Sequence, residues 1–162
     1  LKKALVAIDL LRQLSRTPNA PPLTLIMARI AEVLYYRYSG MHEECLQSVS
    51  EGLELSQKAG VHGFDYWFLI YALTSAVNVQ DSKAVEEFIA KIDSSVTSFT
   101  VWNKSSYHLI RIREALSRKD IGQACFHVDM ASELINNVKS TLSIVFLDVA
   151  RAHVMHELGK QK

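Results

Sequence analysis

All three prolines of this chain fall in one short segment, and their placement constrains the fold more than any other feature of the sequence. Pro18, Pro21 and Pro22 lie within residues 16–22, and no proline follows them. Proline fixes the φ angle and lacks a backbone N–H, so it interrupts a helix when it lies inside one. We therefore predict that residues 16–22 are a Pro-rich linker between the first two helices and that long helices follow it.

Apolar residues recur at helical spacing along most of the sequence, whereas few segments show the alternation expected of strands. The sequence therefore predicts an all-α fold of about eight antiparallel helices. Asp81 or Ser82 is expected to cap the fifth helix, and Asp120, three residues before Gln123, to cap the seventh. The expected helices span residues 2–15, 23–39, 42–59, 64–79, 82–94, 102–118, 121–138 and 140–158, the last stopped by Gly159, with a loop over 95–101.

The composition fits one folded domain. The 162 residues are 49% hydrophobic and 22% charged, which is too apolar for a disordered segment. A formal net charge of +1 gives no general attraction to nucleic acid or to an anionic membrane, and no apolar run is long enough to span a bilayer. Without a signal-peptide pattern or a Cys-x-x-Cys motif, we predict a cytoplasmic location. Because the chain begins with Leu, we expect residues 1–162 to be a single helical-repeat domain cut from a longer protein.

A pattern of small and large residues recurs on the second helix of each helical pair, at steps of about 40 residues. A small residue is followed by a larger apolar residue four positions on and by another small residue three beyond it. Small residues let helices approach closely, and repeats that cannot bury their apolar faces alone must stack into a right-handed solenoid. The pattern comprises Cys45, Val49 and Gly52, then Ala84 and Phe88 with a departure at Lys91, then Ala124, Val128 and Ala131.

On this signature the sequence resembles the tetratricopeptide repeats. The turn at residues 38–41 matches the position of the family's Gly-Asp turn, whereas the first-helix signature matches less well. The long repeat step and the phrase at residues 54–60 resemble the repeat region of MalT-type and LuxR-type bacterial transcriptional regulators. That resemblance implies a non-catalytic sensor or scaffold segment. Neither a P-loop nor a helix-turn-helix pattern is present, so we do not expect this chain to bind DNA directly.

The sixth helix carries the main charge asymmetry, with a net charge of +4 over residues 101–119. Lys104, His108 and Arg111 fall on one helix face, and an aromatic side chain, Tyr107, lies beside them. First helices line the concave surface of such repeats, so a groove there could bind a protein or peptide segment or a small anionic effector. The alternative is a set of ordinary exposed charges. The same face is expected to continue at Arg29 and Arg151, and Tyr36 and Tyr66 are the aromatic residues expected to point outward.

No pattern indicates a catalytic residue, a cofactor or a metal site. His153 and His156 fit exposed side chains near a helix C-terminus, where the helix dipole favours histidine. Cys45 fits a small-residue packing position, where it acts as a compact apolar side chain. Two functional hypotheses stay open. The first is a binding module of a signalling or transcriptional regulator. The second is a self-association segment that forms a homodimer through an exposed end of the solenoid. An uncapped solenoid continues or dimerises, and the last helix is left strongly apolar by Val145, Phe146, Val149 and Val154.

Overall fold

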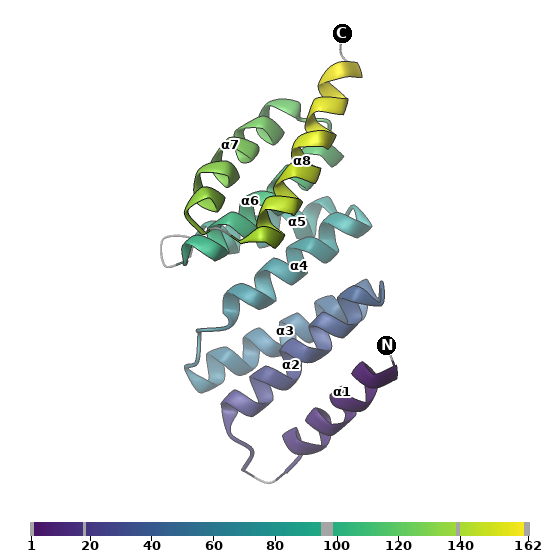
Figure 1. Ribbon diagram of the computed structural model, residues 1–162. Helices are drawn as coiled ribbons and strands as arrows, with labels where there is room; N and C mark the ends of the chain where they lie inside the picture. The colour runs from purple at the N-terminus through teal and green to yellow at the C-terminus, as the bar shows by residue number, and fades with distance from the viewer. Residues whose placement is uncertain (1, 18, 95–98, 139, 161–162) are drawn as a thin grey trace. The chain divides into compact units, whose positions relative to one another are not determined.

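The computed structural model describes residues 2–17, 19–94, 99–138 and 140–160. Within these residues the chain forms eight α-helices and no strand, which confirms the all-α prediction. Figure 1 shows the helices in chain order. They are α1 (Lys2–Ser15), α2 (Pro22–Tyr38), α3 (His42–Ala59), α4 (Asp65–Val79), α5 (Ser82–Asp93), α6 (Val101–Ser117), α7 (Ile121–Val138) and α8 (Thr141–Lys160).

The chain divides into two compact units, residues 1–92 and 93–162. In the first unit α1 packs on α2, α2 on α3, and α3 on α4, with a further contact between α2 and α4. In the second unit α6, α7 and α8 all contact one another. Helices therefore pack mainly against their neighbours in sequence within each unit. A single repeat domain over residues 1–162 stays a prediction.

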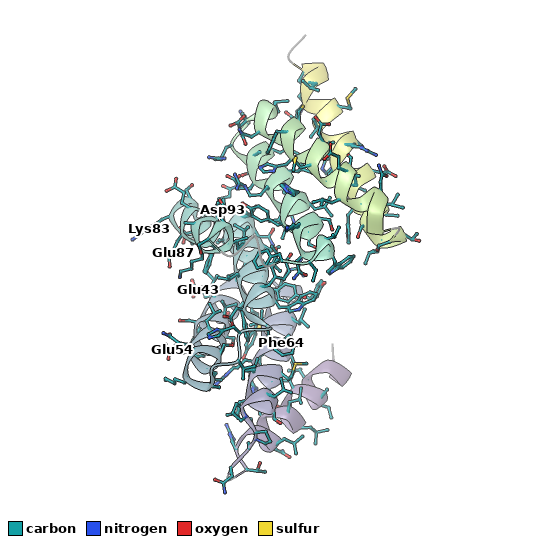
Figure 2. The ribbon with its side chains drawn as sticks, turned by 90° about the vertical axis from the view of Figure 1, so that its left-hand side faces the viewer. Glu43, Glu54, Phe64, Lys83, Glu87 and Asp93 are labelled. Atoms are coloured by element: carbon teal, nitrogen blue, oxygen red, sulfur yellow. The ribbon has the colours of Figure 1, made fainter. Side chains whose placement is uncertain are left out.

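The core of the first unit forms where α3 approaches α2 and α4. Cys45 and Val49 are fully buried there with Phe68, and Phe64 packs against the same cluster. A Cβ atom added to Gly52 would overlap the ring of Phe68, so this position has room for hydrogen alone. The pattern read from the sequence thus identified the packing face of α3. The exposed residues Glu43 and Glu54, by contrast, extend outward from α3 in Figure 2.

The core of the second unit uses the same kind of small residue. Ala124 and Ala131 of α7 are fully buried. Ile112 of α6 and Ala150 of α8 belong to the same cluster as Ala124. The alanines allow α7 to pack closely against its neighbours. At Lys91 of α5, where the sequence pattern fails, the side chain is exposed and pairs with Glu87 at 2.6 Å.

Side-chain caps fix where several helices begin. Asp81 accepts a hydrogen bond from the backbone N–H of Ala84, and Asp120 accepts one from Gln123, each at 3.0 Å. Both acidic caps expected from the sequence are therefore confirmed, and Asp81 rather than Ser82 caps α5. At α6 the cap is Thr100, which accepts from the N–H of Asn103. This cap places the start of α6 one residue earlier than expected, within the predicted loop 95–101, of which residues 95–98 lie outside the described residues.

Three sequence-based expectations are wrong. Tyr66 was expected to point outward, but it is 5% exposed. Because α4 is apolar on nearly every side, its periodicity cannot tell one face from another.

Gly159 was expected to end the last helix, but α8 continues to Lys160, which pairs with Glu157 at 2.6 Å. A glycine inside a helix costs only about 1 kcal/mol, which neighbouring contacts can offset. Pro22 belongs to α2 rather than to the linker, because proline fits the first turn of a helix.

The close contact at α3 predicts a large effect of a small substitution. Gly52→Ala should lower the free energy of unfolding of the first unit by about 1–3 kcal/mol, because Phe68 must move to admit a methyl group. Urea denaturation measures this change, with Trp67 fluorescence reporting the first unit in a Trp102→Phe background and Trp102 fluorescence reporting the second unit in a Trp67→Phe background. Gly122→Ala of α7 is the control in the second unit, since its added Cβ would lie 3.7 Å from Oδ1 of Asp120, an ordinary contact. An equal loss of stability in both variants would contradict the packing described for Gly52.

Candidate functional site

A buried carboxylate on α2 organises the polar groups of the first unit. Glu32 is 3% exposed, and each of its oxygens meets a different arginine. Nε of Arg12 on α1 donates to Oε1 at 2.6 Å, and Nη1 of Arg29 donates to Oε2 at 2.5 Å. Burying a carboxylate is costly unless it is paired and hydrogen-bonded, and here both oxygens are. The carboxylate thereby holds two guanidinium groups in fixed positions.

Both arginines make further contacts that extend the network. Nη2 of Arg12 donates to the hydroxyl of Tyr36 at 2.8 Å, and Nη2 of Arg29 lies 2.8 Å from Oε2 of Glu51 on α3. The hydrogen bond to Glu32 raises the pKa of the Arg12 guanidinium, although burial opposes this effect. The network therefore links α1, α2 and α3 through charged groups. Tyr36 is half-buried and packs on the core, so the prediction that it points outward holds only in part.

A cavity of about 510 Å³ lies beside this network. Such a volume falls within the range of small-molecule sites, roughly 300–1,000 Å³. Its wall combines charged groups with a few apolar side chains, so it can contact both ends of an amphiphilic ligand. The residues that line it are Arg12, Ser15, Arg16, Leu25, Ala28, Arg29, Glu32 and Leu55.

Sequence reasoning predicted Arg29 and Tyr36 but missed Arg12 and Glu32. Arg12 and Glu32 are twenty positions apart, so their contact exists only once α1 folds back on α2. One signal was present in the sequence: Glu32 is the single acidic residue of α2 and sits next to Val33 in a largely apolar helix. A lone carboxylate in such a position indicates a buried ion pair.

Two histidines meet in the second unit. Nδ1 of His108 on α6 lies 2.9 Å from Nδ1 of His127 on α7, so one ring donates a hydrogen bond and the other accepts it. His127 is 4% exposed, and its Nε2 has no hydrogen-bond partner among the described residues. Sequence reasoning identified His108 but missed His127, whose neighbours Phe126 and Val128 gave no sign of a polar contact.

A chain of polar contacts continues from this pair along α6. The hydroxyl of Tyr107 donates to Oδ1 of Asp93 and accepts from Nη1 of Arg111, each at 2.6 Å. Burial, together with the hydrogen bond to Asp93, raises the pKa of Tyr107 to about 12. Arg111 also lies 3.5 Å from Glu114, a buried carboxylate that Arg118 contacts at 2.5 Å. Arg111 and Arg118 are therefore both paired with the same carboxylate, Glu114, within the unit.

The histidine pair favours the neutral state. Burial, followed by the charge of Arg111, lowers the pKa of His127 to about 4 and lowers that of His108 as well. Asp93 has the opposite but weaker effect on both rings. Near neutral pH both rings are uncharged, which suits a single shared hydrogen bond between them.

The remaining predicted site residues lie apart from these contacts. Lys104 is half-buried on α6, and Tyr66 is buried, with its ring edge-on to Trp67. Arg151 on α8 is exposed and bonds to Ser132 of α7 at 2.8 Å. The structure thus brings Arg29 and Tyr36 into one network, and Tyr107, His108 and Arg111 into another. A common groove for all of them stays a prediction.

Metal-ligating side chains and thiols are the other groups of the chain that could carry chemistry. No group of three or more His, Cys, Asp or Glu side chains in the described residues could hold a metal ion. Cys45 is buried and free, and burial raises the pKa of its thiol. None of the described helices is both long and apolar enough to cross a membrane.

No protein-family model, curated protein or solved structure matches this chain.

The histidine pair predicts acid-sensitive stability of the second unit. A folded-state pKa of about 4 for His127, below the usual 6.5, means that the unfolded chain binds more protons between these values. Stability is therefore complete above pH 6.5 and declines as the pH falls towards 4. Unfolding should cost about 2 kcal/mol less at pH 5 than at pH 7, from the His127 shift alone.

Urea titrations at the two pH values test this expectation. In a Trp67→Phe background, Trp102 fluorescence reports the second unit, because these are the two tryptophans of the chain. His127→Leu should remove most of the pH dependence, and His156→Leu, at an exposed position of α8, should leave it intact. Equal pH dependence in the wild type and in His127→Leu would show that this pair does not set acid stability.

Proposed function

We propose that this chain is a non-catalytic binding module built from tetratricopeptide-like helical repeats, as its resemblance to the MalT-type and LuxR-type regulators implies. It recognises a protein segment or a small effector on behalf of a signalling or transcriptional regulator. Packing between sequence neighbours within each unit supports the repeat architecture, because repeat proteins are held together by such contacts. The buried small residues of α3 and α7 support it too.

The observation that carries the proposal is the cavity between α1, α2 and α3. It combines a suitable volume, apolar wall residues and guanidinium groups held in place by a buried carboxylate. Binding sites in proteins are mostly such preformed hollows with a few well-placed polar groups. The network on α6 is less suited to this role, since Tyr107 is buried and bonded to both Asp93 and Arg111, and the Arg111 side chain is only 15% exposed.

A cavity-filling substitution tests whether this hollow binds a ligand. Ala28 lines the cavity and is 4% exposed, so Ala28→Leu should occupy part of the space. We expect at least one member of a panel of acidic, neutral and basic metabolites and short acidic peptides to raise the melting temperature of the wild type by about 2 °C or more. Ala28→Leu should lose that shift, and Ala90→Leu, at an exposed site on α5, should retain it. A shift that survives in folded Ala28→Leu would place binding elsewhere.

A second candidate function is self-association through α8. Its side chains Leu142, Val145, Phe146 and Val149 are between 51% and 58% exposed and follow the i, i+3, i+4, i+7 spacing of one helix face. The opposite face, which includes Leu147 and Val154, is buried in the second unit. Contiguous exposed apolar surface of this kind is typical of interaction sites. A second copy of the chain is the simplest partner for it.

Light scattering over a wide concentration range tests self-association. The wild type should form a dimer as the concentration rises, and Phe146→Glu should keep it monomeric, because a charge would be buried in the interface. Met155→Glu is the control, since Met155 is 67% exposed and lies outside the stripe. A wild type that stays monomeric at high concentration, or a dimer that Phe146→Glu leaves intact, would refute this role for α8.

A further inference from the structure

The wall of the cavity in the first unit carries an excess of positive charge. Three arginines and a single carboxylate, Glu32, line it. Glu51 approaches Arg29 at 2.8 Å and Asp9 approaches Arg12 at 3.5 Å, but neither of these acids lines the cavity. The acids that balance the arginines therefore stand outside the hollow, apart from Glu32. A ligand inside it meets guanidinium groups more than carboxylates.

The two central guanidinium groups are held ready to donate. A guanidinium carries five N–H donors, more than the contacts with Glu32, Tyr36 and Glu51 use on either Arg12 or Arg29. Because Glu32 is buried and bonded through both oxygens, neither arginine must be immobilised when a ligand arrives. Preorganised donors of this kind lose little conformational entropy on binding.

A third cation stands at the edge of the hollow. Arg16 follows the end of α1, and its backbone N–H donates to the carbonyl of Arg12 at 3.2 Å, which fixes where the side chain starts. Its side chain lines the cavity and is exposed, so it can close over a ligand from the solvent side. Arginine forks match the oxygens of carboxylate and phosphate groups, which they bind through paired hydrogen bonds.

Apart from Ser15, whose hydroxyl donates to the carbonyl of Arg12, the rest of the wall is apolar. Leu25 and Ala28 of α2 and Leu55 of α3 also line the hollow, and their side chains offer no hydrogen bond. A ligand that fills the cavity must therefore place a carbon skeleton against these side chains and a polar group against the arginines. Inorganic ions would use only part of such a site.

From these observations we infer that the cavity between α1, α2 and α3 binds a small organic anion, with its carboxylate or phosphate group on Arg12, Arg16 and Arg29. This inference rests on the proposed binding function and adds the chemical class of the ligand. The apolar part of the ligand contacts Leu25 and Leu55, and Glu32 keeps the arginines in place without touching the ligand's charge.

Isothermal titration calorimetry at low ionic strength tests the inference with three probes that share one aromatic body. Benzoate carries a carboxylate, phenyl phosphate a phosphate, and benzyl alcohol no charge. At least one anion should bind tenfold or more tightly than benzyl alcohol, because charge-assisted hydrogen bonds to arginine contribute most of the affinity. The ratio between the two anions then tells which head group the site prefers.

Two substitutions assign the binding to the arginines. Arg16→Gln should weaken the preferred anion at least fivefold without unfolding the protein, because Arg16 is exposed and outside the contacts of Glu32. Arg29→Lys keeps the charge but removes the planar fork, so it should also weaken binding. Lys83→Gln is the control, since Lys83 is an exposed cation on α5 that extends outward in Figure 2.

The outcomes separate this inference from the proposed function. If benzyl alcohol binds as tightly as the anions, or if none of the three probes binds, the anion site is refuted. The proposed binding function is then tested separately, by the melting-temperature shifts of the wild type and Ala28→Leu with the broader panel. If an anion binds but Lys83→Gln weakens it as much as Arg16→Gln does, the effect is general electrostatics and the assignment to this cavity is refuted.

Discussion

The ion pairs of Glu32 are the interaction on which the arrangement of the first unit most depends. Among the side chains of α1 that the structure describes, Ile8 is buried at 4% exposure, whereas Val6, Leu10 and Leu14 are more than half exposed. Hydrophobic contact alone therefore gives α1 a weak preference for its place on α2. The hydrogen bond from Arg12 to buried Glu32 supplies the missing specificity, because a carboxylate in that position must find a cation. The cavity exists because α1 is held by its polar face.

Much of the fold could be predicted from the sequence because its signals are local. The single proline cluster and the caps at Asp81 and Asp120 depend on neighbouring residues, so they fix helix ends without knowledge of the whole. The small residues of α3 and α7 repeat a pattern that only close packing explains, and Gly52 against Phe68 shows why. Where a helix is apolar all round, as α4 is, this logic fails, and Tyr66 was misplaced.

The candidate site was harder to predict, because its contacts join residues distant in sequence. Arg29 and His108 were identified from charge and spacing on their own helices. Arg12, which shares Glu32 with Arg29, and His127, which meets His108, were not, because the contacts Arg12–Glu32 and His108–His127 join different helices about twenty residues apart along the chain. A row of charges on α6 looks the same in the sequence whether it faces solvent or neighbouring side chains. In the structure Arg111 is half-buried and bonds to Tyr107, whereas Arg113 and Arg118 are exposed.

The two polar networks also differ in how they respond to protons, and this difference follows from their residue types. Arginine stays protonated at any pH at which the protein is folded, so the cations around the cavity keep their charge. The histidine pair is neutral because burial and Arg111 oppose a positive charge there. Mild acid therefore acts on the contact between α6 and α7 and leaves the guanidinium groups on α1 and α2 charged. Fixed cations suit the recognition of an anion. A neutral histidine pair joined by one hydrogen bond is suited instead to linking α6 and α7. This difference in chemistry supports the proposal that the first network binds a ligand and that the second holds two helices together.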